Sequence, residues 1–513
     1  MSLARDITTV GGGTLMSRLL AYLRDAWIAA VLGAGPLSEV FFIVLQVVNF
    51  FRRLLSEGAL NSAFVPIWIK LRAGEDGAAN ANRFTVSALA TVGMITGIIV
   101  LVTTVCAPFI IAAIAPGFAS AQRDQAALLL MIVSPYILFA GLVAVAAAAL
   151  SAQGRMLVVA VVTVLFNLTM LLALALVARS TEQLWISFAL AIAVVVAGLI
   201  QLAVAGIALS ANWQWRRTLV RMPDQAGAFI GRALPGLIAT GIPQLKLIAS
   251  TAIASASPAA VSWLYYANRL YELPLGVASI AVAAVIVPRI SASVHAGDDD
   301  ALAAAQSRAY EVAMGLALPA AAGFALLAGQ IAGGLFERGA FTAQDTAAVA
   351  SALTAICIGL PGHVLEKVFG AVSFAHEDTR TPMFAALVGL AAAIAGGVLL
   401  FPRFGHTGVA AAIGLSAWIG AGLLYIILRR RRWLRLDGAA RRRLPLIGLA
   451  SIIMAAVVAG ATYLSGTAPD ASAIKLVILI ALVLLGIAIY LASLQLLGVA
   501  KVRDLAAAVR HRT

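Results

Sequence analysis

The sequence predicts an all-α membrane protein that crosses the bilayer many times. Its 513 residues are 62% hydrophobic and only 11% charged, whereas about 25% of the residues in soluble proteins are charged. Apolar runs long enough to cross a membrane recur along the whole chain. No segment between these runs is long enough to form a soluble domain.

We expect about fourteen transmembrane helices, because apolar runs of about 18 residues or more are typical of membrane crossings. The first run contains Arg18, Arg24 and Asp25, and no small-residue cleavage site follows it. It is therefore predicted to be a membrane helix rather than a cleaved signal peptide. The expected helices cover 9–33, 37–69, 84–115, 125–151, 156–178, 185–209, 226–253, 259–288, 306–334, 343–374, 381–401, 405–428, 445–465 and 473–498.

Basic residues gather in alternate connections between these helices. The net charge is +14, and the basic connections are 70–83, 210–225, 429–443 and 499–513. Fourteen crossings place all four on one side together with both termini, and the positive-inside rule makes that side cytoplasmic. The positive charge thus indicates topology rather than nucleic-acid binding, with an anionic-lipid contact as the alternative role of 429–443.

Two short motifs recur 222 residues apart. Gly117–Gln122 (GFASAQ) resembles Gly339–Gln344 (GAFTAQ), and Val65-Pro66 resembles Val287-Pro288. This spacing contains an even number of expected helices, six, so both copies would have the same orientation, as in transporters built from parallel repeats. The sequence predicts two pseudo-symmetric six-helix lobes, 1–222 and 223–432. The basic loop, two further helices and a cytoplasmic tail make up 433–513.

Charged residues inside the apolar runs are the main chemical signal. Each costs about 2.5–3.5 kcal/mol in the middle of a bilayer on insertion scales, so these residues should face a polar cavity or one another. Several share a helix face, such as Arg18 with Asp25. The charged residues of the first, second and eighth expected helices are Arg18, Arg24, Asp25, Glu39, Arg52, Arg53, Glu57, Arg269 and Glu272.

Two interpretations of these charges stay open on spacing alone. Arg53 with Glu57, and Arg269 with Glu272, are close enough in sequence to pair within one helix and stabilise the bundle. Alternatively, the five arginines against four acids form a site for an anionic head group, because the planar guanidinium suits phosphate.

The sequence contains no motif of a known catalytic centre. It has no Walker A loop, so ATP hydrolysis is not expected, and no HExxH, GxSxG or CxxC motif. Cys106 and Cys357 lie in apolar runs and are expected to pack there. A membrane enzyme acting on lipid-linked sugars would need catalytic acids, and its one candidate, Asp298–Asp300, fits a solvated loop better.

Motifs in the first two helices and the eighth together resemble those of a known family. They are Ser17-Arg18, Arg24-Asp25, Gly33-Ala34-Gly35, Asn49-x-x-Arg52-Arg53-x-x-x-Glu57-Gly58-Ala59, Ala63-Phe64-Val65-Pro66 and Ser262-Trp263-x-Tyr265-Tyr266-Ala267-x-Arg269-Leu270. This set is similar to the signature of the MurJ/MviN lipid II flippases, in the multidrug/oligosaccharidyl-lipid/polysaccharide exporter superfamily. The sequence departs from the pattern at Glu39, Gln46 and Asn268, where that family often has aspartate, lysine and aspartate.

The resemblance implies a transporter, not an enzyme. Its substrate would be lipid II, the undecaprenyl-pyrophosphoryl disaccharide-pentapeptide, moved by alternating access from the inner to the outer leaflet of the bacterial cytoplasmic (inner) membrane. Helices 13 and 14 would hold the lipid tail. A central cationic cavity would bind the head through Arg18, Arg24, Arg52, Arg53 and Arg269, with Asp25, Glu39, Glu57 and Glu272 in gating or ion pairing.

The resemblance further implies a functional monomer without a cofactor or metal. The membrane potential or a monovalent cation would supply energy, and membrane lipids and cell-wall synthesis proteins would be partners. Two other functions remain: a flippase for another lipid-linked oligosaccharide, and a cation-coupled multidrug antiporter of the same superfamily. An antiporter should have acidic sites in an apolar cavity, and the arginine cluster argues against it.

Overall fold

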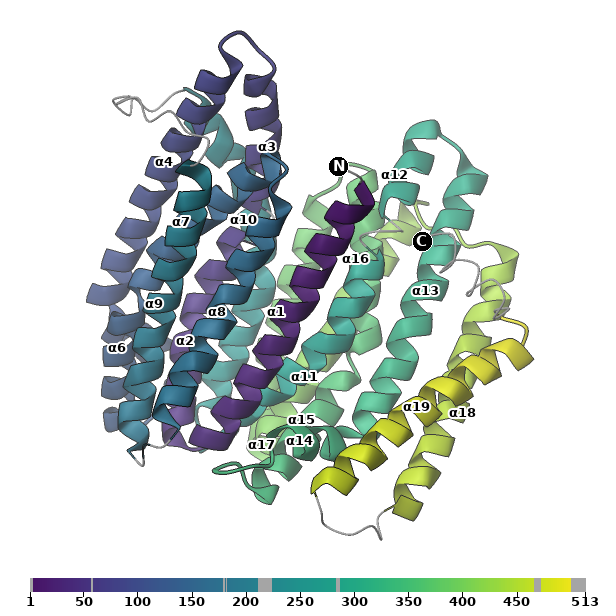
Figure 1. Ribbon diagram of the computed structural model, residues 1–513. Helices are drawn as coiled ribbons and strands as arrows, with labels where there is room; N and C mark the ends of the chain where they lie inside the picture. The colour runs from purple at the N-terminus through teal and green to yellow at the C-terminus, as the bar shows by residue number, and fades with distance from the viewer. Residues whose placement is uncertain are drawn as a thin grey trace. The chain divides into compact units, whose positions relative to one another are not determined.

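The computed structural model describes residues 3–56, 59–178, 180, 182–210, 224–282, 287–465 and 472–499. These residues form helices and short connections, with no strand among them (Figure 1). The helices before residue 211 are α1 (Leu3–Leu32), α2 (Pro36–Ser56), α3 (Ala59–Arg72), α4 (Gly77–Val105), α5 (Ala107–Ile114), α6 (Ser120–Val133), α7 (Pro135–Ala152), α8 (Met156–Val177) and α9 (Gln183–Ser210). Those that follow are α10 (Asp224–Ala254), α11 (Ala260–Ala281), α12 (Val287–Ala296), α13 (Asp299–Leu326), α14 (Ala328–Phe336), α15 (Ala343–Cys357), α16 (Leu360–Ala375), α17 (Arg380–Arg430), α18 (Gly438–Ser465) and α19 (Ser472–Leu496).

The predicted all-α polytopic fold class is confirmed, but several predicted helices are broken in two. Breaks separate α4 from α5, α6 from α7 and α15 from α16, and each second helix has a proline in its first turn. Proline lacks an N–H and suits that position, where no helical partner is needed. Within the described ranges, 9 helical stretches have the length and hydropathy of a membrane crossing. The number of fourteen crossings stays a prediction.

The order and bounds of the helices repeat along the chain. α4 begins at Gly77 and α13 at Asp299, and α5 ends at Ile114 and α14 at Phe336, so both pairs are 222 residues apart. The gap between α8 and α9 corresponds to a sharp kink in α17 at Gly405, whose φ is 53°. The predicted six-helix repeat therefore appears in the secondary structure itself.

Packing divides the chain into two compact units. The first comprises Met1–Ser262 with Arg338–Phe341, and the second Trp263–Glu337 with Thr342–Thr513. The boundary lies beyond residue 222 because α10 packs against α2, α3, α4 and α5. The predicted lobes 1–222 and 223–432 follow the repeat rather than this packing, and they stay a prediction.

Each unit has its own apolar core. In the first, Phe64 of α3 stacks on Phe84 of α4 at 4.9 Å between ring centroids, and both meet Phe229 of α10 edge-on. In the second, α18 and α19 lie side by side (Figure 1), and Tyr490 of α19 donates a hydrogen bond to the Gly315 carbonyl of α13 at 2.8 Å. This bond fixes the two C-terminal helices to the rest of their unit.

The two copies of the repeated glycine motif dock in corresponding ways inside the first unit. The N–H of Gly117 donates to Ser255 Oγ at 3.0 Å, and the N–H of Ala340, next to Gly339, donates to the Ala30 carbonyl at 2.8 Å. A Cβ atom on Gly117 would lie 2.4 Å from the Ala256 backbone, and one on Gly339 would lie 2.2 Å from the Ala30 oxygen. Glycine is therefore required at both places by the close approach of two backbones.

Candidate binding site

A hydrogen-bonded polar network joins α1 to α8 in the first unit. Arg24 donates from Nε and Nη2 to Asp25 Oδ1 at 2.9 and 2.6 Å, and from Nη1 to Asn167 Oδ1 at 3.0 Å. Asn167 in turn donates from Nδ2 to the Ser17 carbonyl at 3.1 Å. Arg24, Asp25 and Asn167 are 7%, 0% and 6% exposed, so the network holds a buried charge pair whose polar atoms have partners. A buried ion pair is tolerated only under that condition.

Aromatic side chains surround the Arg24 guanidinium. Its Cζ lies 5.7 Å from the centre of the Phe166 ring, in the range of a cation–π contact. Phe166 packs against Tyr136 of α7 at 5.5 Å between centroids. The Tyr136 hydroxyl is also in the electrostatic field of both Arg52 and Arg24. Tyr136 thus marks a region that the arginines of α1 and α2 share.

The other predicted arginines of the first unit are half-buried. Arg52 donates from Nε to Asn49 Oδ1 at 3.0 Å, on its own helix α2. Arg53 follows it at the end of α2, and Arg18 lies on α1. Arg18 forms no ion pair with any residue that the structure describes. Its positive charge is therefore not neutralised by a described carboxylate.

Glu39 occupies a different environment from the arginines. Its side chain is buried in α2, and its Oε1 accepts a hydrogen bond from the N–H of Val261, in the first turn of α11, at 3.1 Å. The neighbouring Ser38 and Ser262 hydroxyls are 3.0 Å apart. A carboxylate is stabilised there by the unpaired N–H groups of the helix start. Glu39 has backbone amides as its partners among the described residues, and its gating role stays a prediction.

Arg269 and Glu272 lie one turn apart on α11, in the second unit. Arg269 Nη1 is 3.2 Å from Glu272 Oε2, and both side chains are about one-fifth to one-quarter exposed, at 20% and 24%. Asn268 Nδ2 lies 3.5 Å from Glu272 Oε1. This geometry agrees with the pairing interpretation for Arg269 and Glu272. Glu57, the expected partner of Arg53, lies outside the described residues.

The structure adds two residues that sequence reasoning missed, Asn167 and Tyr136. Asn167 is a lone amide in the apolar helix α8, and a polar side chain in such a run is itself a signal of an internal contact. Tyr136 follows a proline at the start of α7 and carries no comparable signal. Both were overlooked because the search followed charge.

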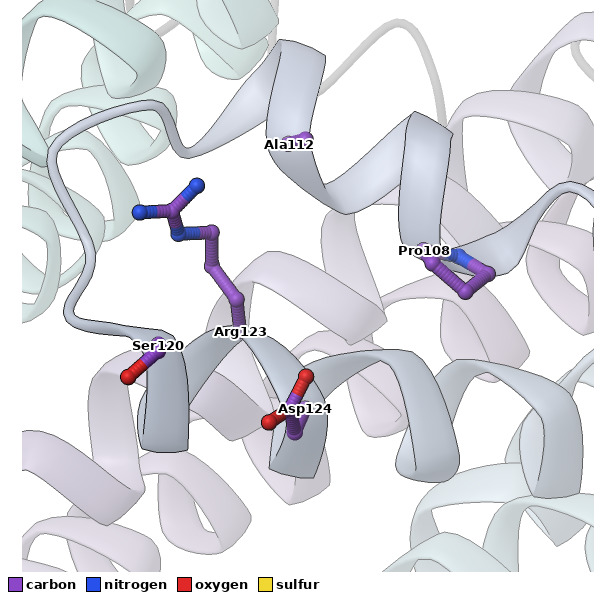
Figure 2. A pocket seen from close by; sticks show the side chains of 5 residues that line it. All are labelled: Pro108, Ala112, Ser120, Arg123 and Asp124. Atoms are coloured by element: carbon purple, nitrogen blue, oxygen red, sulfur yellow. The ribbon is translucent and has the colours of Figure 1, made fainter.

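A small pocket lies apart from this network, between α5 and α6. Its volume is about 230 Å³, and its lining residues are Pro108, Ala112, Ser120, Arg123 and Asp124. Arg123 extends from α6 toward the connection between the two helices (Figure 2), where its Nε donates to the Phe118 carbonyl at 2.9 Å. The pocket contains none of the predicted binding residues.

Comparison with known proteins gives consistent results along the chain. The family model described as "Lipid II flippase MurJ" matches residues 28–493. A "Probable lipid II flippase MurJ" of Rhizobium meliloti (strain 1021) is 37% identical over 464 residues, covering 89% of this chain and 86% of that protein. A "Lipid II flippase MurJ" of Burkholderia cenocepacia is 31% identical over 444 residues, with 84% of each chain covered.

Solved structures agree at the level of the fold. A chain described as "Lipid II flippase MurJ, inward closed conformation" superposes with a TM-score of 0.80, covering 97% of this chain and 99% of that one at 22% sequence identity. An inward-facing multidrug resistance MATE family transporter of the MOP superfamily gives a TM-score of 0.66 at 14% identity, covering 81% and 94% of the two chains. These two likenesses concern architecture alone.

Proposed function

Because the chain belongs to the MurJ family of lipid II flippases, we propose that it moves lipid II from the inner to the outer leaflet of the bacterial cytoplasmic membrane. It is a multi-pass membrane protein of a transporter family, not of an enzyme family. The observation that carries the proposal is the buried Arg24, held in place by Asp25 and Asn167. Such an arginine inside a membrane helix needs a function that repays its cost.

The chemistry of the substrate fits this site. Lipid II has a charged pyrophosphate and a sugar–peptide head, and moving it through hydrocarbon would remove the hydration of its charges. Arg24 uses three of its five N–H donors in contacts to Asp25 and Asn167. Two donors therefore remain to bind phosphate oxygens, in a geometry that the network already fixes. Preorganisation of this kind reduces the entropic cost of binding.

The remaining arginines extend this binding role in the proposal. Arg18, Arg52 and Arg53 bind the same anionic head from α1 and α2, and Arg269 binds it from α11. Asp25, Glu39, Glu57 and Glu272 pair with these arginines or with backbone amides when the head group is absent. Such exchange of partners would let the transporter alternate between inward and outward access, because the charges are never left unpaired.

The lipid tail is proposed to lie along α18 and α19. The outward side chains of α19 are large and apolar, and Val477, Leu484 and Ile487 are 65%, 61% and 52% exposed. An apolar surface of this kind is suited to an acyl or isoprenoid chain rather than to water. The tail can then stay in hydrocarbon while the head moves, so that only the head requires a polar path.

Topology and energy supply complete the proposal. Both termini and the basic segments lie in the cytoplasm, following the positive-inside rule. The protein works as a monomer, among membrane lipids and cell-wall synthesis proteins. The energy comes from the membrane potential, about 2.3 kcal/mol per charge per 100 mV, or from a monovalent cation.

The test is a depletion–rescue experiment in bacteria. The native flippase is switched off, this chain is expressed, and the exposure of labelled lipid II on the periplasmic side is followed. We expect rescue by the wild-type chain and at least a tenfold loss of exposed lipid II for stably expressed Arg24→Ala. Failure of a well-expressed wild-type chain would instead favour another lipid-linked oligosaccharide or a multidrug substrate.

A further inference from the structure

A second group of ionisable side chains lies inside the second unit, on α11 and α16. Tyr271, halfway along α11, is 3% exposed, and its hydroxyl is 2.5 Å from Nδ1 of His363 on α16. The two rings also meet edge-on, at 5.8 Å between centroids. None of the roles proposed above uses either residue. The pair is therefore an unexplained polar contact within an apolar part of the chain.

A carboxylate completes the group. Glu366 lies three residues after His363 on α16, so the two side chains share a helix face. It is also one of the groups whose charge acts on the Tyr271 hydroxyl. Its position is fixed by Gly420 of α17, since a Cβ atom there would lie 1.8 Å from Glu366 Oε1. The absence of a side chain at residue 420 thus leaves the space that the carboxylate occupies.

We propose that Tyr271, His363 and Glu366 form a proton-binding site within the membrane part of the second unit. Neutral His363 can accept a hydrogen bond at Nδ1 from the Tyr271 hydroxyl. When a proton adds to the ring, Nδ1–H can donate to the same hydroxyl oxygen, because a phenol can both donate and accept. The contact between α11 and α16 therefore persists in both states, and Glu366 offsets the positive charge that the proton brings.

Other ionisable groups near this site are accounted for. On α11, Arg269 is paired with Glu272 at 3.2 Å. Cys357 of α15 also acts on the Tyr271 hydroxyl, and Lys367, next to Glu366, is exposed.

Further along α16, Phe369 contacts Tyr310 of α13 and Tyr425 of α17. Glu311, next to Tyr310, is paired with Arg308 and Arg443 at 3.3 Å each. On α12, Arg289 and His295 are exposed. Imidazole is the group among these that ordinarily gains and loses a proton between pH 5 and 8.

Membrane-embedded chains of histidine and acidic side chains are typical of proton pathways in transporters. If the proton is taken up from one side and released to the other during transport, a proton gradient would drive lipid II movement. This coupling rests on the proposed function, whereas the binding of the proton does not. The two parts can therefore be tested separately.

The first experiment measures proton binding by the purified full-length protein in nanodiscs. Histidine side chains are observed by NMR between pH 5 and 8, with the His363 signal assigned by its loss in His363→Gln. We expect this signal to titrate within that range and its midpoint to move by about one pH unit or more in Glu366→Gln. A His363 signal that does not titrate, or whose midpoint is the same in Glu366→Gln, would overturn the proposal.

The second experiment measures lipid II transport in proteoliposomes at clamped voltage, with and without a gradient of one pH unit. Each coupled proton can change the driving force by up to about tenfold under this gradient, so we expect the wild-type rate to change several-fold. His363→Gln, Tyr271→Phe and Gly420→Ala should lose this response, the last because its new Cβ displaces the Glu366 carboxylate.

Matched control variants keep the site intact. Tyr310→Phe removes a buried hydroxyl with no hydrogen-bond partner among the described residues, and Gly422→Ala adds a Cβ on α17 that meets nothing within 4 Å. Both should respond to the gradient as the wild type does. A wild-type rate that ignores the gradient, or a response kept by His363→Gln, contradicts the coupling. Titration of His363 without any lipid II transport would leave the proton site standing and refute the proposed function.

Discussion

At the scale of single residues, the site depends on an arginine whose position is fixed by a neutral amide from another helix. Arg24 and Asp25 could be selected from the sequence because charges in an apolar run are rare and costly. Asn167 could not be selected in the same way, since an amide adds little cost and its contact spans 143 residues of sequence. Spacing could therefore identify the charges but not the partner that orients them.

We predict that Asn167→Ala lowers both transport and stability. It removes the hydrogen bond to Arg24 and leaves a buried donor unsatisfied, which costs about 1–3 kcal/mol. Thr163→Ala is the control on the same helix, because Thr163 is exposed and bonds only to the Ala160 carbonyl of its own helix. Thermal unfolding and lipid II transport should show a clear loss for the first variant and almost none for the second. Equal behaviour of the two would remove Asn167 from the site.

A second residue-scale prediction concerns Asp378, in the turn between α16 and α17. Its carboxylate accepts hydrogen bonds from the N–H groups of Arg380 and Thr381, both at 3.0 Å, and from Arg431 at 2.5 Å. Burial raises the pKa of Asp378, but the hydrogen bonds from Thr381, Arg431 and Arg380 outweigh it and hold the pKa below its usual value. The ionised form therefore stabilises the fold above the ordinary pKa of about 4, and this contribution is lost as the pH falls through the lower, folded pKa.

Asp378→Asn should accordingly lower stability at pH 7 by about 0.5–2 kcal/mol, as for the loss of a helix cap. The same variant should show a weaker loss of stability than the wild type between pH 5 and pH 3. Thermal unfolding across this range provides the measurement, with the exposed Asp300→Asn as control. An unchanged unfolding temperature of Asp378→Asn at pH 7 would show that the cap contributes nothing.

At the scale of helices and their connections, the two glycine loops can be tested directly. Gly339→Ala and Gly117→Ala would push a methyl group into the backbone of Ala30 or Ala256, and overpacking of this kind costs about 1–3 kcal/mol. Gly35→Ala is the control in the same region, because a Cβ there meets nothing within 4 Å. We expect lower unfolding temperatures for the first two variants and no such decrease for Gly35→Ala. A Gly339→Ala protein as stable as the wild type would contradict the close docking.

The sequence predicted the location of the helices better than their continuity. Apolar composition identifies a run that can cross a membrane, but it does not show where that run breaks. The breaks before α5, α7 and α16 accompany Pro108, Pro135 and Pro361, and proline is also tolerated inside membrane helices when neighbours satisfy the backbone. Whether a proline breaks or only bends a helix depends on packing that the sequence alone does not give.

At the scale of the whole molecule, the repeat of 222 residues was visible in two short motifs and reappears in the helix bounds. The boundary between the packed units could not be predicted from it. Repetition reports how the chain arose from similar segments, whereas the boundary reflects which surfaces α10 buries, and it packs against helices of the first unit.

Topology can be tested on the same scale. In a background without Cys106 and Cys357, Ser257→Cys should react with a membrane-impermeant thiol reagent added outside intact cells. Arg432→Cys, in the basic connection between α17 and α18, should react only after the membrane is permeabilised, because that connection is expected in the cytoplasm. The opposite pattern would invert the proposed orientation.

The most direct test of the central claim is lipid II movement by the purified protein in proteoliposomes. Labelled lipid II is placed in one leaflet, and its appearance in the other is followed for the wild type, for Arg24→Ala and for Arg430→Ala, an exposed arginine outside the site. The proposed site predicts transport by the wild type and Arg430→Ala, and at least a tenfold slower rate for a folded Arg24→Ala protein. Transport by Arg24→Ala at the wild-type rate would show that the buried arginine does not bind the head group.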